Sequence, residues 1–209
     1  MCKLYQAALL AAGATCLQVP ASAQVLIQPS VDSKEQRSGL RSLSSCLAQA
    51  RPQWARQTLA QPYLSAAQAR LAGHALSGRD KCIKGAEVEV TFRTSGLVGS
   101  MAEHFVRPRI ATADLPRVAQ KLSTLPALNA SEDFAFCVTS SSPAAARDLL
   151  LSEPGSDGES RAVGQLASYV PACVVTGERL VVDQQALRAL ISVAFYREST
   201  AAPSSEIPR

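Results

Sequence analysis

The sequence predicts a mainly α-helical protein with short β-strands, built from a helix–helix–strand–helix unit that occurs twice, with each copy closed by a disulfide. Two observations lead to this prediction. Beyond residue 23 the chain has four cysteines, and the interval from Cys46 to Cys82 equals the interval from Cys137 to Cys173. Apolar side chains in both halves also recur at helical spacing, whereas strict alternation of apolar and polar residues is confined to short segments.

The equal intervals justify comparing the chain with itself. Shifted by 91 positions, residues 46–92 and 137–183 are identical at 12 of 47 positions. Beyond residue 92 the shift becomes 90 positions, and it then aligns Arg107 with Arg197. Repetition at a constant spacing indicates an internal duplication, here of about 60 residues.

The second copy shows the unit most clearly. Proline is favoured in the first turn of a helix, so Pro143 predicts a helix over about 143–152. Pro154-Gly155 ends it, and Ser156 with Glu159 three residues later has the spacing of a capping box. A second helix is therefore predicted from Ser156 to about Tyr169.

The first copy repeats this plan. Pro52 begins a helix, Pro62 interrupts it, and Ser65 caps a second helix that extends toward Leu76. Gln68 stands where the second copy has the glutamate of its capping box.

Each unit closes with a strand and a helix. EVEVTFR at 87–93 alternates as a half-buried strand does, RLVVD at 179–183 is its shorter counterpart, and the two are expected to pair about a pseudo-two-fold axis. Ser95 and Asp183 are the predicted N-caps of the final helices. The following residues form apolar stripes expected in the core: Leu97, Met101, Phe105, Leu187, Leu190, Ile191, Ala194 and Phe195.

The N-terminus has the pattern of a signal peptide. Lys3 precedes the apolar stretch from Ala7 to Val19, and Ala21-Ser22-Ala23 supplies small residues for cleavage after Ala23. The stretch is shorter than the roughly 20 residues that span a bilayer, so it is not expected to act as a membrane anchor. Cys16 raises a lipoprotein alternative, but Gly13-Ala14-Thr15 does not fit the usual sequence before a lipidated cysteine. We therefore expect a secreted, periplasmic protein with no transmembrane segment after cleavage.

The predicted organisation follows from these signals. In order, it comprises a signal peptide (1–23), an N-terminal segment (24–43), the first unit (44–109), a connector with a short helix near 113–122 (110–134), the second unit (135–198) and a disordered tail (199–209).

Four cysteines allow three disulfide pairings. Equal spacing favours Cys46 with Cys82 and Cys137 with Cys173, although a crossed pairing between the copies stays open. A zinc site is not indicated, because no two cysteines have the close spacing of such sites.

Four arginines occupy matched places in the two copies, Arg56 with Arg147 and Arg70 with Arg161. They are candidates for an anion-binding site, and the competing interpretation is that each bonds helix-end carbonyls or an acid in its own copy. The net charge of +4, or +3 once Lys3 leaves with the signal peptide, is too small to indicate a nucleic-acid partner.

The tandem Cys-x35-Cys plan, with PGSDGESRA at 154–162 and LRALISVAFYR at 187–197, resembles hypothetical secreted bacterial proteins of unknown function. This resemblance implies the compartment and the architecture, and it implies no activity, cofactor or site.

No catalytic or cofactor-binding motif is present in the sequence. The leading hypothesis is therefore a non-catalytic binding or protein-interaction module with an unidentified protein or small-molecule partner, without cofactor or metal. One alternative is a hydrolase-like enzyme with a site between the copies, where His74 or His104 would lie beside an acid and a hydroxyl. The other alternative is a structural protein of the cell envelope.

Overall fold

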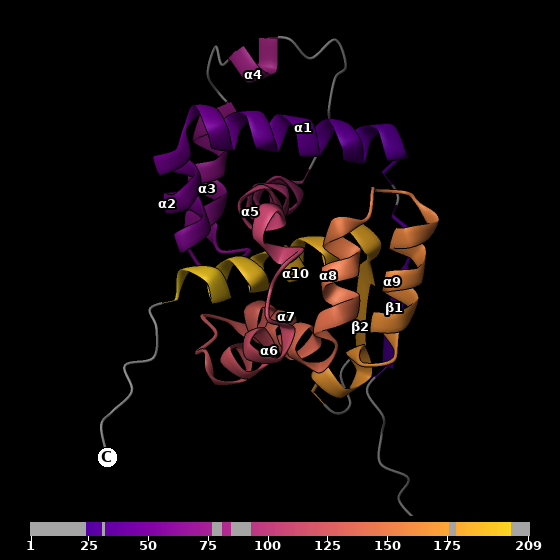
Figure 1. Ribbon diagram of the computed structural model, residues 1–209. Helices are drawn as coiled ribbons and strands as arrows, with labels where there is room; N and C mark the ends of the chain where they lie inside the picture. The colour runs from indigo at the N-terminus through magenta and orange to yellow at the C-terminus, as the bar shows by residue number, and fades with distance from the viewer. Residues whose placement is uncertain (1–23, 31, 77–80, 85–92, 176–178, 202–209) are drawn as a thin grey trace, which may run out of the picture.

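The computed structural model describes residues 24–30, 32–76, 81–84, 93–175 and 179–201, and these form a mainly helical protein (Figure 1). The elements are β1 (Gln24–Gln28), α1 (Lys34–Ala50), α2 (Pro52–Ala60), α3 (Ala66–Leu76), α4 (Lys81–Lys84), α5 (Thr94–Ile110), α6 (Leu115–Thr124), α7 (Ala130–Ser141), α8 (Pro143–Leu151), α9 (Asp157–Ala167), the 3₁₀ helix η1 (Val170–Cys173), β2 (Arg179–Asp183) and α10 (Gln184–Thr200). The predicted signal peptide lies outside the described residues.

Helices α5 and α10 cross at the centre of the molecule. In Figure 1, α1 lies above this pair, α6 and α7 lie below it, and α2–α3 and α8–α9 lie on opposite sides. The predicted core stripes are buried, apart from the half-buried Phe105. Among the side chains with almost no exposed surface are Leu47, Leu59, Leu97, Met101, Leu149, Leu150, Leu166, Leu187 and Ile191.

The crossing of α5 and α10 depends on a glycine. A Cβ atom placed on Gly99 would lie 2.2 Å from the Cβ of Ala189 and 2.5 Å from its Cα, far inside van der Waals contact. Gly99 and Ala189 are also 90 positions apart, the spacing that the sequence comparison found for these two helices. Two positions that the sequence comparison aligns therefore touch where α5 and α10 cross.

We expect Gly99→Ala to lower the free energy of unfolding by about 1 to 3 kcal/mol, because the added methyl group overlaps the backbone of α10. Gly164→Ala in α9 is the matched control, since nothing lies within 4 Å of a Cβ there. Its expected effect has the opposite sign, a gain of about 0.5 to 1 kcal/mol from helix propensity. Urea denaturation measures the free energy of unfolding of both variants. Equal changes in Gly99→Ala and Gly164→Ala would contradict the close approach of α5 and α10.

The other helices recur at constant spacing too. Helices α2 and α8 begin and end 91 positions apart, as do α3 and α9, whereas α5 and α10 are 90 positions apart. The turn before α3 and α9 is also repeated, because Leu64 (φ 65°) and Gly155 (φ 71°) both have a left-handed backbone. This recurrence agrees with the spacing in the sequence, and the duplication itself stays a prediction.

The predicted caps of these helices are present. Ser156 Oγ accepts the backbone N–H of Glu159 at 3.2 Å, and Ser65 Oγ accepts that of Gln68 at 3.1 Å. The side chains of Glu159 and Gln68 do not complete the box on the serine N–H. They accept the N–H of the left-handed residues instead, at 2.8 Å from Gly155 and 2.9 Å from Leu64.

Both predicted disulfides are confirmed, with S–S distances of 2.04 Å for Cys46–Cys82 and 2.10 Å for Cys137–Cys173. Cys46 lies in α1 and Cys137 in α7. Their partners Cys82 and Cys173 lie in α4 and η1, which follow α3 and α9. Each disulfide therefore encloses two helices of its own unit.

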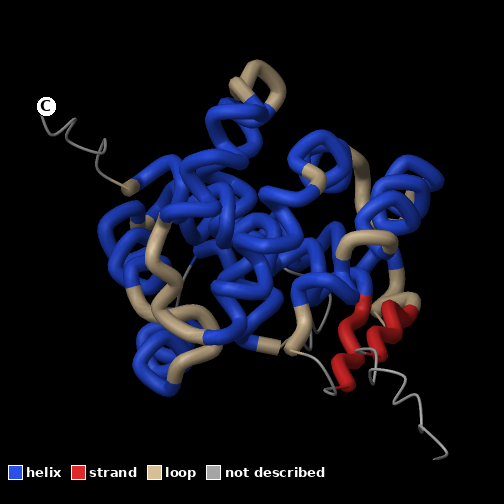
Figure 2. The backbone as a smooth tube through the Cα atoms, turned by 90° about the horizontal axis from the view of Figure 1, so that it is seen from below, coloured by secondary structure: helices blue, strands red, loops and turns tan. Residues whose placement is uncertain are grey.

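The strand pairing differs from the prediction. Strand β2 pairs in parallel with β1, so that Leu26 lies opposite Val181 and Ile27 opposite Val182 (Figure 2). The expected partner at 87–93 lies outside the described residues except for Arg93, which precedes α5. The segment at 24–28 is only five residues long, too short for its alternation to predict a strand. Its pairing joins residues 155 positions apart in the chain.

Some boundaries also differ. Ser95 is not an N-cap, because α5 begins at Thr94 and Arg93 occupies the cap position; cap propensity does not define a helix end to within one or two residues. Asp183 is confirmed as a cap, accepting the N–H of Ala186 at 2.7 Å. Helices α1 and α7 run across the unit boundaries placed at 44 and 135, and α10 extends to Thr200, inside the predicted tail.

Candidate binding groove between α1 and α5

The described residues form an open groove of about 700 Å³ between α1 and α5, called here the α1–α5 groove. Helix α1 lines it with a polar face that includes Ser42, Ser45 and Gln49, and helix α5 lines it with His104 and Arg107. All the residues lining it belong to these two helices, so the groove lies within the first half of the chain rather than between the two units.

Helical periodicity explains why α1 has this face. Residues three and four positions apart share one side of a helix, which places Ser42, Ser45 and Gln49 together. The buried side of the same helix carries Leu40 and Leu47, which pack in the core. The polar side of α1 is therefore left to form the wall of the groove.

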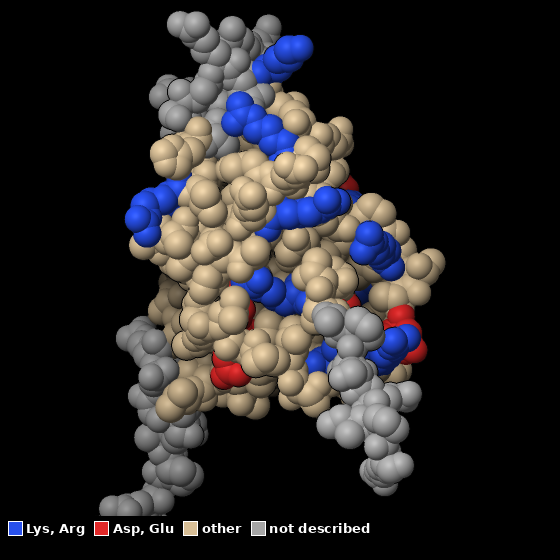
Figure 3. All heavy atoms as spheres, turned by 90° about the vertical axis from the view of Figure 1, so that its left-hand side faces the viewer, with Lys and Arg blue, Asp and Glu red and all other residues tan. Residues whose placement is uncertain are grey.

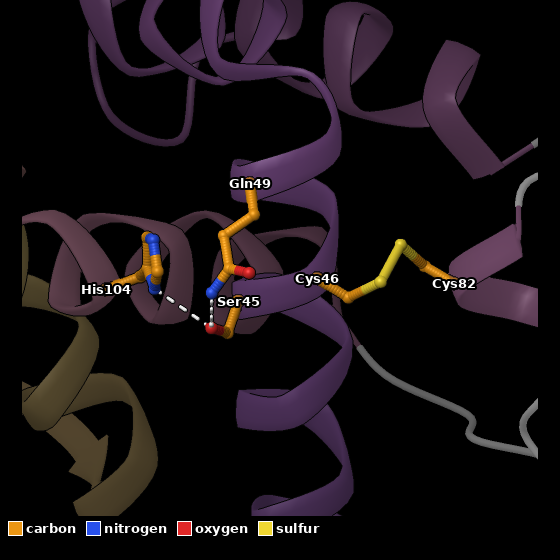
Figure 4. The surroundings of a disulfide bond; sticks show 5 residues. All are labelled: Ser45, Cys46, Gln49, Cys82 and His104. Atoms are coloured by element: carbon orange, nitrogen blue, oxygen red, sulfur yellow. Dashed lines mark hydrogen bonds between the residues drawn. A yellow bond between two sulfur atoms is a disulfide. The ribbon is translucent and has the colours of Figure 1, made fainter.

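A hydroxyl and an imidazole meet in the groove (Figure 4). The Oγ of Ser45 lies 2.9 Å from Nδ1 of His104, and the side-chain amide of Gln49 donates to the same Oγ at 3.2 Å. Which of Ser45 and His104 donates in this hydrogen bond depends on the tautomer of the imidazole. The Cys46–Cys82 disulfide lies at the edge of this group.

One end of the groove adjoins a set of charged side chains, called here the ion cluster. Its members come from four helices and one loop, and are Arg37, Arg41, Glu103, Arg107, Glu153, Glu159 and Arg188. These seven side chains are joined by a continuous chain of ion pairs.

Arg188 of α10 is at the buried centre of the ion cluster. Its guanidinium forms two parallel hydrogen bonds to Glu103, both 2.8 Å, and a third contact of 3.2 Å to Glu159. The side chains of Arg188, Glu103 and Glu159 are 3%, 4% and 1% exposed. Glu159 also pairs with the buried Arg37 of α1.

The groove end of the cluster is more open. Arg41 contacts Glu103 at 3.2 Å and Glu153 at 2.8 Å, and Arg107 contacts Glu153 at 2.9 Å. The side chains of Arg41 and Arg107 are 21% and 31% exposed, and both line the groove. The cluster therefore changes from fully buried pairs to solvent-accessible arginines along its length.

The ion cluster has four arginines and three glutamates, so it carries one excess positive charge. The buried members are matched to one another, which leaves the excess at the open end. An anion entering the α1–α5 groove would meet the partly exposed guanidinium groups there.

The charges shift one another's pKa values. Burial by itself would raise the pKa of Glu159, but the hydrogen bonds from Arg37 and from the N–H of Gly155 outweigh it, so the pKa is lowered. Burial opposes the same change at Glu153, where hydrogen bonds from Arg107 and Arg41 lower the pKa. Burial also lowers the pKa of Arg41, which the charge of Glu103 only partly offsets.

The glutamate shifts predict acid sensitivity. A carboxylate whose pKa is lower in the folded state stabilises that state above its unfolded pKa of about 4.3, and this contribution is lost as the pH falls through the folded pKa. We expect the free energy of unfolding to fall below about pH 4. In Glu159→Gln the free energy of unfolding should depend less on pH in this acid range, because the titrating group is removed.

An amide side chain can make the backbone contact of Glu159, because Gln68 accepts the N–H of Leu64 as Glu159 accepts that of Gly155. The Glu159→Gln variant should therefore fold, with lower stability at neutral pH because Arg37 loses its anionic partner. Urea denaturation at a series of pH values measures both effects, and an acid limb that is identical in the two proteins would contradict the role given to Glu159.

The four arginines singled out from the sequence do not join the ion cluster. Arg56 lies 5.7 Å from the centre of the Phe105 ring, Arg70 donates to the carbonyl of Ala66 in its own helix, and Arg147 pairs with the adjacent Asp148. Arg161 is exposed on α9. None of the four lines the α1–α5 groove.

A different matched pair has reciprocal contacts. Arg107 of α5 donates to the carbonyl of Leu151 at the end of α8, and Arg197 of α10 donates to the carbonyls of Ala60 and Gln61 at the end of α2. Arg107 thus caps α8 and Arg197 caps α2, each a helix of the other half of the chain. The alignment of Arg107 with Arg197 was visible in the sequence, but the exchange of partners was not.

Within the described part of the chain, no group of three or more potential ligand residues is placed to hold a metal ion. The same residues include no helix long and apolar enough to cross a membrane. Comparison with protein-family models, with curated proteins and with solved structures finds no match for this chain.

Proposed function

We propose that the protein is a secreted, non-catalytic binding module whose α1–α5 groove binds a negatively charged group of its partner. The observation that carries this proposal is the excess positive charge of the ion cluster, which reaches the groove through Arg41 and Arg107. Two disulfides of the expected pairing support an oxidising compartment.

Arginine suits this role because its planar guanidinium offers several N–H donors to a carboxylate or phosphate. Arg107 already uses donors on Glu153 and on the Leu151 carbonyl, which hold the side chain in place. Its partner Glu153 is 62% exposed, so an incoming anion could share or replace that carboxylate without entering the buried core. The serine and glutamine side chains of α1 provide further hydrogen-bonding groups beside it.

N-acetylglutamate is a suitable probe, because it presents a carboxylate on the same short stem as an acidic side chain. We expect a titration to move the NMR signals of the Arg41 and Arg107 side-chain N–H groups in a saturable way, with millimolar affinity. N-acetylglutamine, of the same shape but neutral, is expected to leave these signals unchanged.

Arg107→Gln should weaken the binding of N-acetylglutamate at least about fivefold, because it removes the charge at the open end of the cluster. Arg161→Gln, on the exposed surface of α9, is the matched control and should bind as the unmodified protein does. Absence of saturable shifts, or equal binding by the two variants, would overturn the proposed function.

The Ser45–His104 pair is the one observation that favours the hydrolase alternative. A general base needs an orienting group, and in this groove Nδ1 of His104 is already used by the serine. The neighbouring Glu103 has both carboxylate oxygens on Arg188. Among the described residues, no acid contacts His104 to orient the imidazole and stabilise its charged form.

For this reason we expect Ser45 to be inert toward a fluorophosphonate probe. Intact-mass spectrometry after incubation should show no added mass, and Ser45→Ala should behave identically. A covalent adduct mapped to Ser45, or turnover of an ester that His104→Ala abolishes, would instead establish the hydrolase.

A further inference from the structure

We infer that the α1–α5 groove receives one acidic, amphipathic helix of a partner protein, in the place that α6 takes on the other half of the molecule. This inference rests on the proposed function, since it specifies the partner that brings the negative charge. It is carried by the comparison of two helix pairs, α1 with α5 and α7 with α10.

The second helix pair has a third helix packed on it. Helix α6 contacts both α7 and α10 and buries Val118 and Leu122. It is held at one end by Lys121, whose ammonium lies 3.4 Å from the carboxylate of Glu198 and donates to the Glu198 and Ala201 carbonyls at the end of α10. A ten-residue helix is thus sufficient to cover this pair.

The corresponding positions of the first pair are open. Phe136 and Ala194 are 4% and 0% exposed in the covered pair. Their counterparts at spacings of 91 and 90 are Ser45 and His104, which are half-buried and line the groove. Helix α2 contacts both α1 and α5, but it corresponds to α8, and no helix in the described part of the chain corresponds to α6.

The charges indicate which kind of helix fits. Where Lys121 meets Glu198 in the covered pair, the first pair has Pro108, flanked by Arg107 and Arg109. Figure 3 shows the side of the molecule that bears α2 and α3, where more basic than acidic side chains are also visible, although neither helix lines the groove. A helix docking here needs glutamate or aspartate where α6 has lysine.

This requirement disfavours a second copy of the same chain as the occupant. The α6 helix carries Lys121, and by the correspondence of Glu198 with Pro108 its ammonium would lie beside Arg107 and Arg109. Like charges brought together across an interface are destabilising. The occupant is therefore a partner with an acidic helix.

A modified α6 peptide tests the inference directly. The probe is residues 113–126 with Arg117→Glu and Lys121→Glu, and a hydrocarbon staple between positions 120 and 124 keeps so short a peptide helical. Both stapled positions are exposed in the protein, on the side away from Val118 and Leu122. The comparison peptide has the same staple and the natural arginine and lysine.

By fluorescence polarisation, we expect the acidic peptide to bind the full-length protein at least about tenfold more tightly than the basic one. Ser45→Trp fills the groove and should weaken the acidic peptide by a similar factor, whereas Ser160→Trp on exposed α9 should have no effect. Ser42→Trp, at an exposed position on the same face of α1, replaces Ser45→Trp if that variant does not fold.

Equal affinity for the two peptides, or binding that neither groove variant weakens, would overturn the inference. The N-acetylglutamate titration separates this failure from that of the proposed function. If the small anion binds and the acidic helix does not, the helical partner is wrong and the anion site stands. If neither binds, both proposals are wrong.

Discussion

Arg188→Met is expected to lower the free energy of unfolding by about 3 to 5 kcal/mol, because it leaves two buried carboxylates without their shared cation. Glu103 would lose both of its 2.8 Å hydrogen bonds and keep only the longer contacts with Arg41 and Arg107. Glu159 would lose its ion pair with Arg188 and keep the one with Arg37. The carbonyls of Leu150 and Ser152, which accept from Arg188 at 3.0 and 2.9 Å, would also lose a donor. The methionine side chain nearly fills the space of the arginine. The lower free energy of unfolding would therefore result from the missing charge rather than from a cavity.

Urea denaturation followed by circular dichroism measures this loss. The matched control is Arg147→Met, because Arg147 pairs with the half-exposed Asp148 and such pairs contribute less than about 1 kcal/mol. Adding Glu103→Gln to Arg188→Met should restore part of the stability, since one of the uncompensated charges is then removed. Equal losses in Arg188→Met and Arg147→Met would contradict the central position of Arg188.

Removing either disulfide by paired Cys→Ala substitution is expected to cost about 3 to 4 kcal/mol. In the chain-entropy model this cost depends on the length of the closed loop, and the two loops span the same separation of 36 residues. The two double variants should therefore be destabilised to a similar extent. Their effects should add in the variant without any of the four cysteines, because the bridges belong to different parts of the fold.

The measurement is again the free energy of unfolding, in the absence of reductant. The unmodified protein treated with reductant serves as the control, and it should match the variant that lacks all four cysteines. If removing one disulfide left the free energy of unfolding unchanged, that disulfide would not restrict the unfolded chain in the way the entropic model requires.

Much of the local structure was predictable because it depends on neighbouring residues. Pro143 and Ser156 marked the starts of α8 and α9, and Asp183 marked the start of α10, since caps and first-turn prolines act within one turn of helix. The disulfides were predictable from equal cysteine spacing. The boundary at Ser95 was the exception, because Thr94 and Arg93 offer competing starts.

The candidate site was largely hidden from sequence analysis. Arg37, Glu159 and Arg188 come from three separate helices, and each looks like an ordinary charge in an amphipathic pattern. Glu159 was identified only as a capping residue, and His104 only as a candidate for the alternative enzyme. The arginines chosen for their matched positions, such as Arg56 and Arg147, lie outside the groove, because a repeated residue can be repeated for local packing alone.

The sequence by itself determined the helical plan and most of the caps, because these depend on contacts within a turn of helix. The constant spacing of the cysteines favoured the observed pairing without deciding it. Only the tertiary structure decided that β1 pairs with β2, that Gly99 meets Ala189, and that four arginines share three glutamates beside an open groove. These arrangements join residues up to 155 positions apart in the chain. No local pattern records such contacts, since they exist only once the helices have packed.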